Sequence, residues 1–126
     1  MKNYDLIVTK DLHGYGVGIY DSSRDCIARW FGDFTKSDAR EIVQFCNRTI
    51  KTREKFNAQM CDEIFVKVIQ AGKKYYAVKS FELSGGRNLT VSSRGFSSEI
   101  AACRCGAILE ILSDVQFISD GDSDDV

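Results

Sequence analysis

Apolar residues recur along this chain in short runs of β-forming residues, and every third run is followed by a segment with helical spacing. Turns rich in glycine or aspartate separate many of the runs. This order predicts an α+β fold of two β-β-β-α units, about 4–57 and 62–113, in which two helices pack on an antiparallel sheet. The six expected strands are Leu6–Thr9, Val17–Tyr20, Cys26–Phe31, Ile64–Gln70, Tyr75–Phe81 and Leu89–Arg94.

Each expected helix is preceded by a glycine, an aromatic residue and a hydroxyl-bearing residue. Thr35-Lys36-Ser37-Asp38 has the spacing of a capping box, with Asp38 in place of the commoner glutamate. Ser97 or Ser98 caps the second helix, which the apolar pattern carries to Ser113. The end of the first helix is open, because the chain has no proline and Thr52–Asp62 could extend it.

Arg104 is the most informative position of the second helix. At about 100° per residue it falls in the middle of an apolar stripe. A guanidinium stays charged at any working pH, and burying it unpaired is costly. Arg104 therefore needs an anion from its own chain, a partner chain or a ligand phosphate, unless its side chain runs along the stripe to solvent. The stripe consists of Ile100, Cys103, Ala107, Ile108 and Ile111.

Two features favour self-association. Ala102 and Gly106 form a small-residue flank on the second helix, against which another helix could pack closely. The first unit also has more large aromatic residues than a small core accommodates, and Phe45 falls outside the apolar stripe of its helix. A symmetric dimer is the commonest outcome of such surfaces. The aromatic residues are Trp30, Phe31, Phe34 and Phe45.

With 126 residues, 44% of them hydrophobic and 28% charged, the chain has the composition of one globular domain, which we place at 1–118. Residues 119–126 are rich in aspartate, and we expect a disordered acidic tail there. A net charge of −1 gives no general attraction to nucleic acid. We see no signal peptide or membrane span, so we expect a cytoplasmic protein whose five cysteines are reduced.

No recognised motif for catalysis or metal binding is present in the sequence. The single histidine, His13, lies in a glycine-rich turn. The Gly14-x-Gly16-x-Gly18 motif opens a strand, whereas a phosphate-binding loop would open a helix. Cys103-x-Cys105 lacks a second pair of ligands, so zinc is not expected. The sequence favours a binding protein without enzyme activity, cofactor or metal.

The second unit concentrates side chains suited to a nucleotide. Tyr76 and Phe81 offer rings on which a base can stack. Asn88 follows Gly85-Gly86, where a ligand can approach the backbone and an amide can contact a ribose or a base. Each feature also has a structural explanation, because a strand aromatic can belong to the core and a turn arginine is usually solvated. The guanidiniums available for phosphate oxygens are those of Arg87, Arg94 and Arg104.

Three polar residues stand in the expected elements: Arg53 late in the first helix, Asn88 in the Gly-Gly-Arg-Asn loop and Arg104 in the final helix. In these residues, in its length and in its mixed order of strands and helices, the chain resembles the first family of phage anti-Thoeris proteins, which sequester the cyclic ADP-ribose isomer made by bacterial TIR enzymes. It implies a ligand held at a subunit interface. The chain departs from the family pattern at Ile108, where a second arginine is expected one turn after Arg104. The segment Ser93–Ser98 also resembles small β-β-β-α repeat domains of unassigned function in bacteria.

The first hypothesis is therefore a homo-oligomeric sponge that binds a cyclic ADP-ribose-like nucleotide without cleaving it and so blocks TIR-based immunity. By this resemblance Arg104 and Arg53 would hold the pyrophosphate, Asn88 a ribose or base edge, and Phe81 or Tyr76 would stack on adenine. The alternative is a protein-binding inhibitor or adaptor that acts through exposed aromatic residues or the acidic tail. A third hypothesis, RNA binding through lysines and Arg53 near tyrosines, conflicts with the acidic tail.

Overall fold

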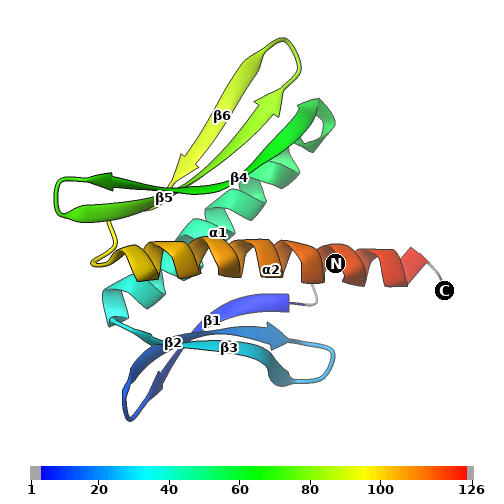
Figure 1. Cartoon of the computed structure of the whole chain (residues 1–126). Coiled ribbons are helices and arrows are strands. Elements are labelled where there is room, and N and C mark those ends of the chain that lie inside the picture. Colours follow the sequence, from blue (N-terminus) through cyan, green and yellow to red (C-terminus); the bar gives the residue numbers. More distant parts are fainter. Residues whose placement is uncertain (1–3, 125–126) are drawn as a thin grey trace.

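The computed structural model describes the backbone of residues 4–124 and the side chains of residues 4–113. Two antiparallel three-stranded sheets, ordered β1-β2-β3 and β4-β5-β6, lie on opposite sides of two helices (Figure 1). The predicted α+β fold of two β-β-β-α units is confirmed, with one separate sheet in each unit. The elements are β1 (Tyr4–Asp11), β2 (Gly14–Asp21), β3 (Cys26–Phe34), α1 (Lys36–Phe56), η1 (Asn57–Gln59), β4 (Met60–Ala71), β5 (Lys74–Leu83), β6 (Arg87–Ser92) and α2 (Glu99–Asp124).

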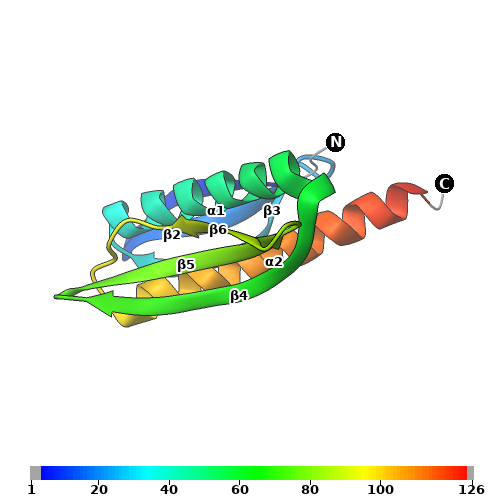
Figure 2. The ribbon, with the colours of Figure 1, turned by 90° about the horizontal axis from the view of Figure 1, so that it is seen from above.

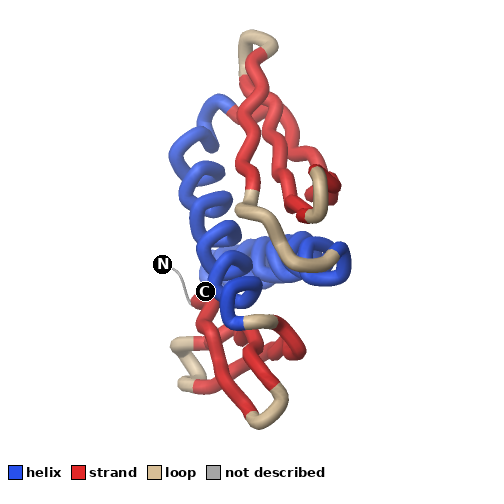
Figure 3. The backbone as a smooth tube through the Cα atoms, turned by 90° about the vertical axis from the view of Figure 1, so that its left-hand side faces the viewer, coloured by secondary structure: helices blue, strands red, loops and turns tan. Residues whose placement is uncertain are grey.

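α2 lies between the two sheets, and α1 runs from the β1–β3 sheet to lie beside the β4–β6 sheet, as the side view in Figure 3 shows. α1 packs on β1 and β2, α2 packs on β4 and β5, and the two helices pack against each other (Figure 2). A single apolar core joins the two units, since it includes Ile19 from β2, Phe45 from α1 and Leu109 from α2. Within residues 4–124, no helix has the length and apolar character needed to cross a membrane.

The start of α1 follows the prediction, and its end is now defined. Thr35 is the N-cap, and its hydroxyl accepts a hydrogen bond from the backbone N–H of Asp38 at 3.1 Å. The Asp38 carboxylate accepts a hydrogen bond from the Ser97 hydroxyl at 2.6 Å, whereas in a capping box it would return to the N-cap. Thr52–Asp62 extends the helix only as far as Phe56, because β4 begins at Met60.

The prediction that Arg104 lies in a buried stripe is wrong. Of the predicted stripe Ile108 is fully buried and Ile111 is half-buried, but Ile100 is 65% exposed and Cys103, Arg104 and Ala107 are exposed as well. The helix is apolar on nearly all sides, so periodicity alone does not decide which side faces the core. In the folded chain the side with Ala102 and Cys105, both fully buried, faces the core. Within residues 99–113, the buried residues of α2 are Ala101, Ala102, Cys105, Gly106, Ile108, Leu109, Leu112 and Ser113.

The backbone of α2 continues to Asp124, past the predicted end at Ser113. The side chains of the acidic tail expected over 119–126 lie outside the described residues. The disorder of this tail stays a prediction.

Most of the residues that favoured self-association in the sequence pack against other parts of the same chain. Phe45 is fully buried, and Phe34 is 6% exposed. A Cβ on Gly106 would lie 3.0 Å from Val66 Cγ1, so this glycine lets α2 approach β4 of its own chain. Trp30 lies across the β1–β3 sheet, where its indole N–H donates to Thr9 Oγ1 at 2.7 Å, and remains 47% exposed. The sequence arguments from Phe45 and from the Ala102 and Gly106 flank were therefore wrong.

Candidate functional site

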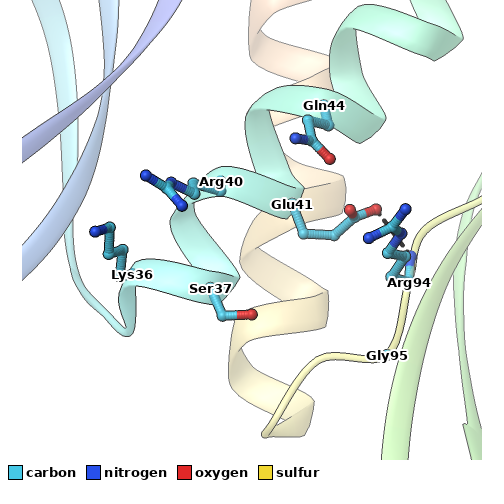
Figure 4. A pocket seen from close by; sticks show the side chains of 7 residues that line it. All are labelled: Lys36, Ser37, Arg40, Glu41, Gln44, Arg94 and Gly95. Atoms are coloured by element: carbon cyan, nitrogen blue, oxygen red, sulfur yellow. Dashed lines mark hydrogen bonds between the residues drawn. The ribbon is translucent and has the colours of Figure 1, made fainter.

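A hollow of about 470 Å³ lies between the first turns of α1 and the segment that joins β6 to α2 (Figure 4). In this view Ser37 and Glu41 extend from α1 toward the segment of Arg94, and Gln44 lies next to Glu41 along the helix. Lys36 and Arg40 extend from α1 in the opposite direction. We call this hollow the Arg94 pocket. Its lining consists of Lys36, Ser37, Arg40, Glu41, Gln44, Arg94 and Gly95.

Two carboxylates of α1 fix the segment that closes the pocket. Oε2 of Glu41, which is 7% exposed, accepts hydrogen bonds from the backbone N–H of Arg94 at 2.8 Å and from Arg48 Nη2 at 2.9 Å (Figure 4 draws the first). Asp38 binds the hydroxyl of Ser97 three residues further along. Because these carboxylates are buried and hydrogen-bonded, the pocket wall is held in place before any ligand arrives.

The pocket is electrostatically positive. It has three cationic side chains, those of Lys36, Arg40 and Arg94, against the single carboxylate of Glu41. Among the described residues, none of these three cations has a hydrogen bond or ion pair through its side chain, whereas Glu41 is already engaged by Arg48. The arrangement therefore suits a ligand that carries phosphate or carboxylate groups.

Of the seven residues predicted to bind a ligand, only Arg94 lines this pocket. Arg104 lies elsewhere: its Nη1 donates to the Gly32 carbonyl at 3.0 Å, and its guanidinium lies 5.8 Å from the centre of the Phe34 ring. Arg104 lines a separate hollow of about 300 Å³ with Phe31 and Asp33. Asp33 has a positive φ of 67° in the irregular end of β3, where the register with β2 shifts.

Arg53 belongs to a network of ion pairs that joins α1, β4, β5 and α2, and Phe81 contacts the lysine of this network. Arg53 donates two hydrogen bonds to Glu63, at 2.5 Å and 2.7 Å, and this interaction is the main reason why the pKa of Glu63 is lowered. Lys79, which is 3% exposed, contacts both Glu63 and Glu110, at 3.8 Å and 3.1 Å. Its ammonium lies 5.8 Å from the ring centre of Phe81, which is fully buried. Phe81 therefore has no open face for a base in the single chain.

The remaining predicted residues lie along the β4–β6 sheet. Arg87 donates to Gln59 Oε1 at 2.7 Å, and the adjacent Asn88 is exposed opposite Glu82. Tyr76 is half-buried on β5. It precedes Glu82, the residue opposite Asn88, by six positions, which places it about 20 Å along the strand from that pair. The single chain does not gather Tyr76, Asn88 and Arg104 into one site.

The sequence prediction missed Lys36, Arg40, Glu41 and Gln44. A partial signal was present, because Lys36, Arg40 and Gln44 recur at i, i+4 and so share one face of α1. The deciding contact, from Glu41 to the backbone of Arg94, joins positions 53 residues apart and has no local sequence signature.

Among the described residues, no group of three histidine, cysteine or acidic side chains could hold a metal ion. The pKa of the Cys105 thiol is raised, first by its hydrogen bond to Cys46 and then by burial, so it is a poor nucleophile. No family model, curated protein or solved structure matches the chain.

Proposed function

We propose that this protein binds a small phosphate-bearing molecule of nucleotide size in the Arg94 pocket and retains it without chemical change. The observation that carries the proposal is the set of three cations around one hollow, whose only carboxylate is already engaged by Arg48. A hollow of about 470 Å³ is within the usual range for small-molecule sites. Ser37 and Gln44 supply polar groups for hydroxyl groups or a base.

A cyclic ADP-ribose isomer is the first ligand to test. Its pyrophosphate matches the cationic rims, and the resemblance to anti-Thoeris proteins supplies the biological setting, namely sequestration of a TIR signal in a host bacterial cytoplasm. The phosphate contacts proposed here differ from those that the resemblance implies. Arg94, Lys36 and Arg40 would bind the phosphates, in place of Arg104 and Arg53. The protein would act by holding the ligand, and the ligand would remain intact while it is bound.

A thermal-shift screen tests the proposal with cyclic ADP-ribose isomers, ADP-ribose and inorganic pyrophosphate as probes. A ligand at one hundred times its Kd stabilises the fold by about 2.7 kcal/mol, which raises Tm by several degrees. Heating the complex and chromatographing the supernatant should recover the nucleotide intact. The variant Lys36→Ala/Arg40→Ala should lose most of the shift, whereas Lys51→Ala, an exposed α1 lysine outside the pocket, should keep it. A shift that is equal in all these variants, or a ligand recovered as a cleaved product, would contradict the proposal.

A further inference from the structure

One carboxylate oxygen of Glu41 is occupied and the other has no partner. Oε2 accepts two hydrogen bonds, from the backbone N–H of Arg94 at 2.8 Å and from Arg48 Nη2 at 2.9 Å. Oε1 accepts none from the described residues, although Glu41 is only 7% exposed. A carboxylate has about four acceptor positions, so those on Oε1 are open. A nearly buried acceptor without a partner is costly, and it indicates a donor that comes from outside the chain.

The open oxygen can be reached from the Arg94 pocket, which Glu41 lines. Within the described part of the chain, every fully enclosed polar side-chain atom has a hydrogen-bond partner, so an oxygen without one must border open space. Gln44 lies next to Glu41 along α1 (Figure 4). Its amide is exposed and forms no hydrogen bond to another described residue. The pocket therefore places an open carboxylate oxygen and an open amide about one helical turn apart.

A neutral hydrogen-bond donor fits this pair of groups better than a cation or a base does. Arg48 balances the charge of Glu41, and the three cations of the pocket repel an ammonium group. A base needs a surface on which to stack, and none of the described residues that line the pocket is aromatic. Hydroxyl groups need no such surface. One hydroxyl can donate to Oε1 of Glu41 while its neighbour bonds to the Gln44 amide.

We propose that the Arg94 pocket is specific for phosphates of ribose and that Glu41 is the residue that selects the sugar. Oε1 of Glu41 accepts a hydrogen bond from one ribose hydroxyl, Gln44 bonds to the adjacent hydroxyl, and the Arg94 guanidinium binds the phosphate. This inference rests on the proposed function, because it requires a phosphate ligand in the same pocket. It adds the class of ligand, namely a ribonucleotide or ribose phosphate with two adjacent free hydroxyls.

Isothermal titration with ADP and 2′,3′-dideoxy-ADP tests the selection, because the two nucleotides differ only in the ribose hydroxyls. The wild-type protein should bind ADP about ten- to one-hundred-fold more tightly, which corresponds to a hydrogen bond to a charged acceptor. In Glu41→Gln the carbonyl can keep the bond to the Arg94 backbone, while an amide NH₂ replaces the open oxygen. The ratio of the two Kd values should then fall to about three-fold or less, since a neutral amide bonds a hydroxyl more weakly.

The ratio of Kd values distinguishes selection of the sugar from support of the pocket wall. If Glu41 only held the wall, Glu41→Gln would weaken both nucleotides equally and leave the ratio at its wild-type value, which would overturn the proposal. Lys36→Ala is the matched control, because it removes a cation from the same pocket. It should weaken ADP and 2′,3′-dideoxy-ADP by the same factor and keep the ratio.

Inosine diphosphate tests whether Glu41 contacts the base, since it keeps both hydroxyls and lacks the amino group of adenine. It should bind as ADP does. If it binds at least about ten-fold more weakly than ADP while 2′,3′-dideoxy-ADP binds equally well, the open oxygen contacts the base and the assignment to ribose is wrong.

Failure of this inference can be told apart from failure of the proposed function. If ADP and 2′,3′-dideoxy-ADP bind equally well and Lys36→Ala weakens both, the pocket binds phosphate and only the selection of ribose is refuted. If neither ADP nor inorganic pyrophosphate binds, the proposed function and this inference are both refuted.

Discussion

Replacing Lys79 with methionine tests whether the charge network between the two units stabilises the fold. Met keeps most of the apolar stem of the lysine, so the substitution removes the ammonium and little packing. Lys79 is 3% exposed and contacts Glu110 at 3.1 Å and Glu63 at 3.8 Å. Removing one partner of a buried ion pair costs about 3–5 kcal/mol when the other charge is left without compensation.

The expected loss for Lys79→Met lies below that range. The side chains of Glu63 and Glu110 are 28% and 31% exposed, so water recovers part of the interaction, and Glu63 keeps its bonds to Arg53. We therefore expect a loss of about 2–3 kcal/mol in the free energy of unfolding, measured by urea denaturation with circular dichroism. The double variant Lys79→Met/Glu110→Gln should recover most of it, since no uncompensated charge remains at Glu110.

If Lys79→Met changes the free energy of unfolding by less than about 0.5 kcal/mol, the network contributes no more than an ordinary surface position. If the double variant is as unstable as the single variant, the loss comes from packing and not from the unpaired Glu110.

The remaining predictions concern the core, the β1–β3 sheet and pH. Phe45→Ala should cost about 3–5 kcal/mol in urea unfolding, because a fully buried ring is lost; a loss below about 1 kcal/mol would show that Phe45 lies outside the core. Gly32→Ala should displace the Trp30 ring, which a Cβ would approach to 2.0 Å, and should red-shift the Trp30 emission; an unchanged spectrum would count against this packing. The pKa of Glu63 is lowered from 4.5, so its stabilisation is present above that value and is lost as pH falls through the lower folded-state pKa. Glu63→Gln should therefore flatten the pH dependence of unfolding below about pH 5, and an unchanged profile would show that the Arg53 contact is not responsible.

The order of elements was predictable because strands and turns carry local signals. Turns that contain glycine, such as the one at Gly85-Gly86, and the hydroxyl cap at Thr35 depend on neighbouring residues, and the structure has a turn between β5 and β6 and a helix start at these places. The side of a helix that faces the core is decided by tertiary packing. In α2 both sides are apolar, so Arg104 could be assigned to a buried stripe although its side chain is exposed.

The candidate site was less predictable than the fold. Arg94 was predicted to contact phosphate from its residue type and its place in the second unit, whereas Lys36 and Arg40 lie in the other unit of the chain. Their proximity to Arg94 depends on the buried carboxylate of Glu41, which holds the backbone of Arg94 against α1. The aromatic residues show that a suitable residue type does not make a side chain accessible. Phe81 was expected to stack on a base, but its ring is fully buried and lies against the ammonium of Lys79.

Isothermal titration of the wild-type protein, Arg94→Ala and Arg104→Ala with a cyclic ADP-ribose isomer tests the central claim most directly. The Arg94 side chain forms no hydrogen bond or ion pair within the described residues, so its removal should leave the fold intact. The account predicts that Arg94→Ala weakens binding about ten- to one-hundred-fold, the value of a lost charged hydrogen bond, while Arg104→Ala binds as the wild type does. If binding falls at least about ten-fold in Arg104→Ala and is unchanged in Arg94→Ala, the ligand occupies the site implied by the resemblance, and the Arg94 pocket is not the binding site.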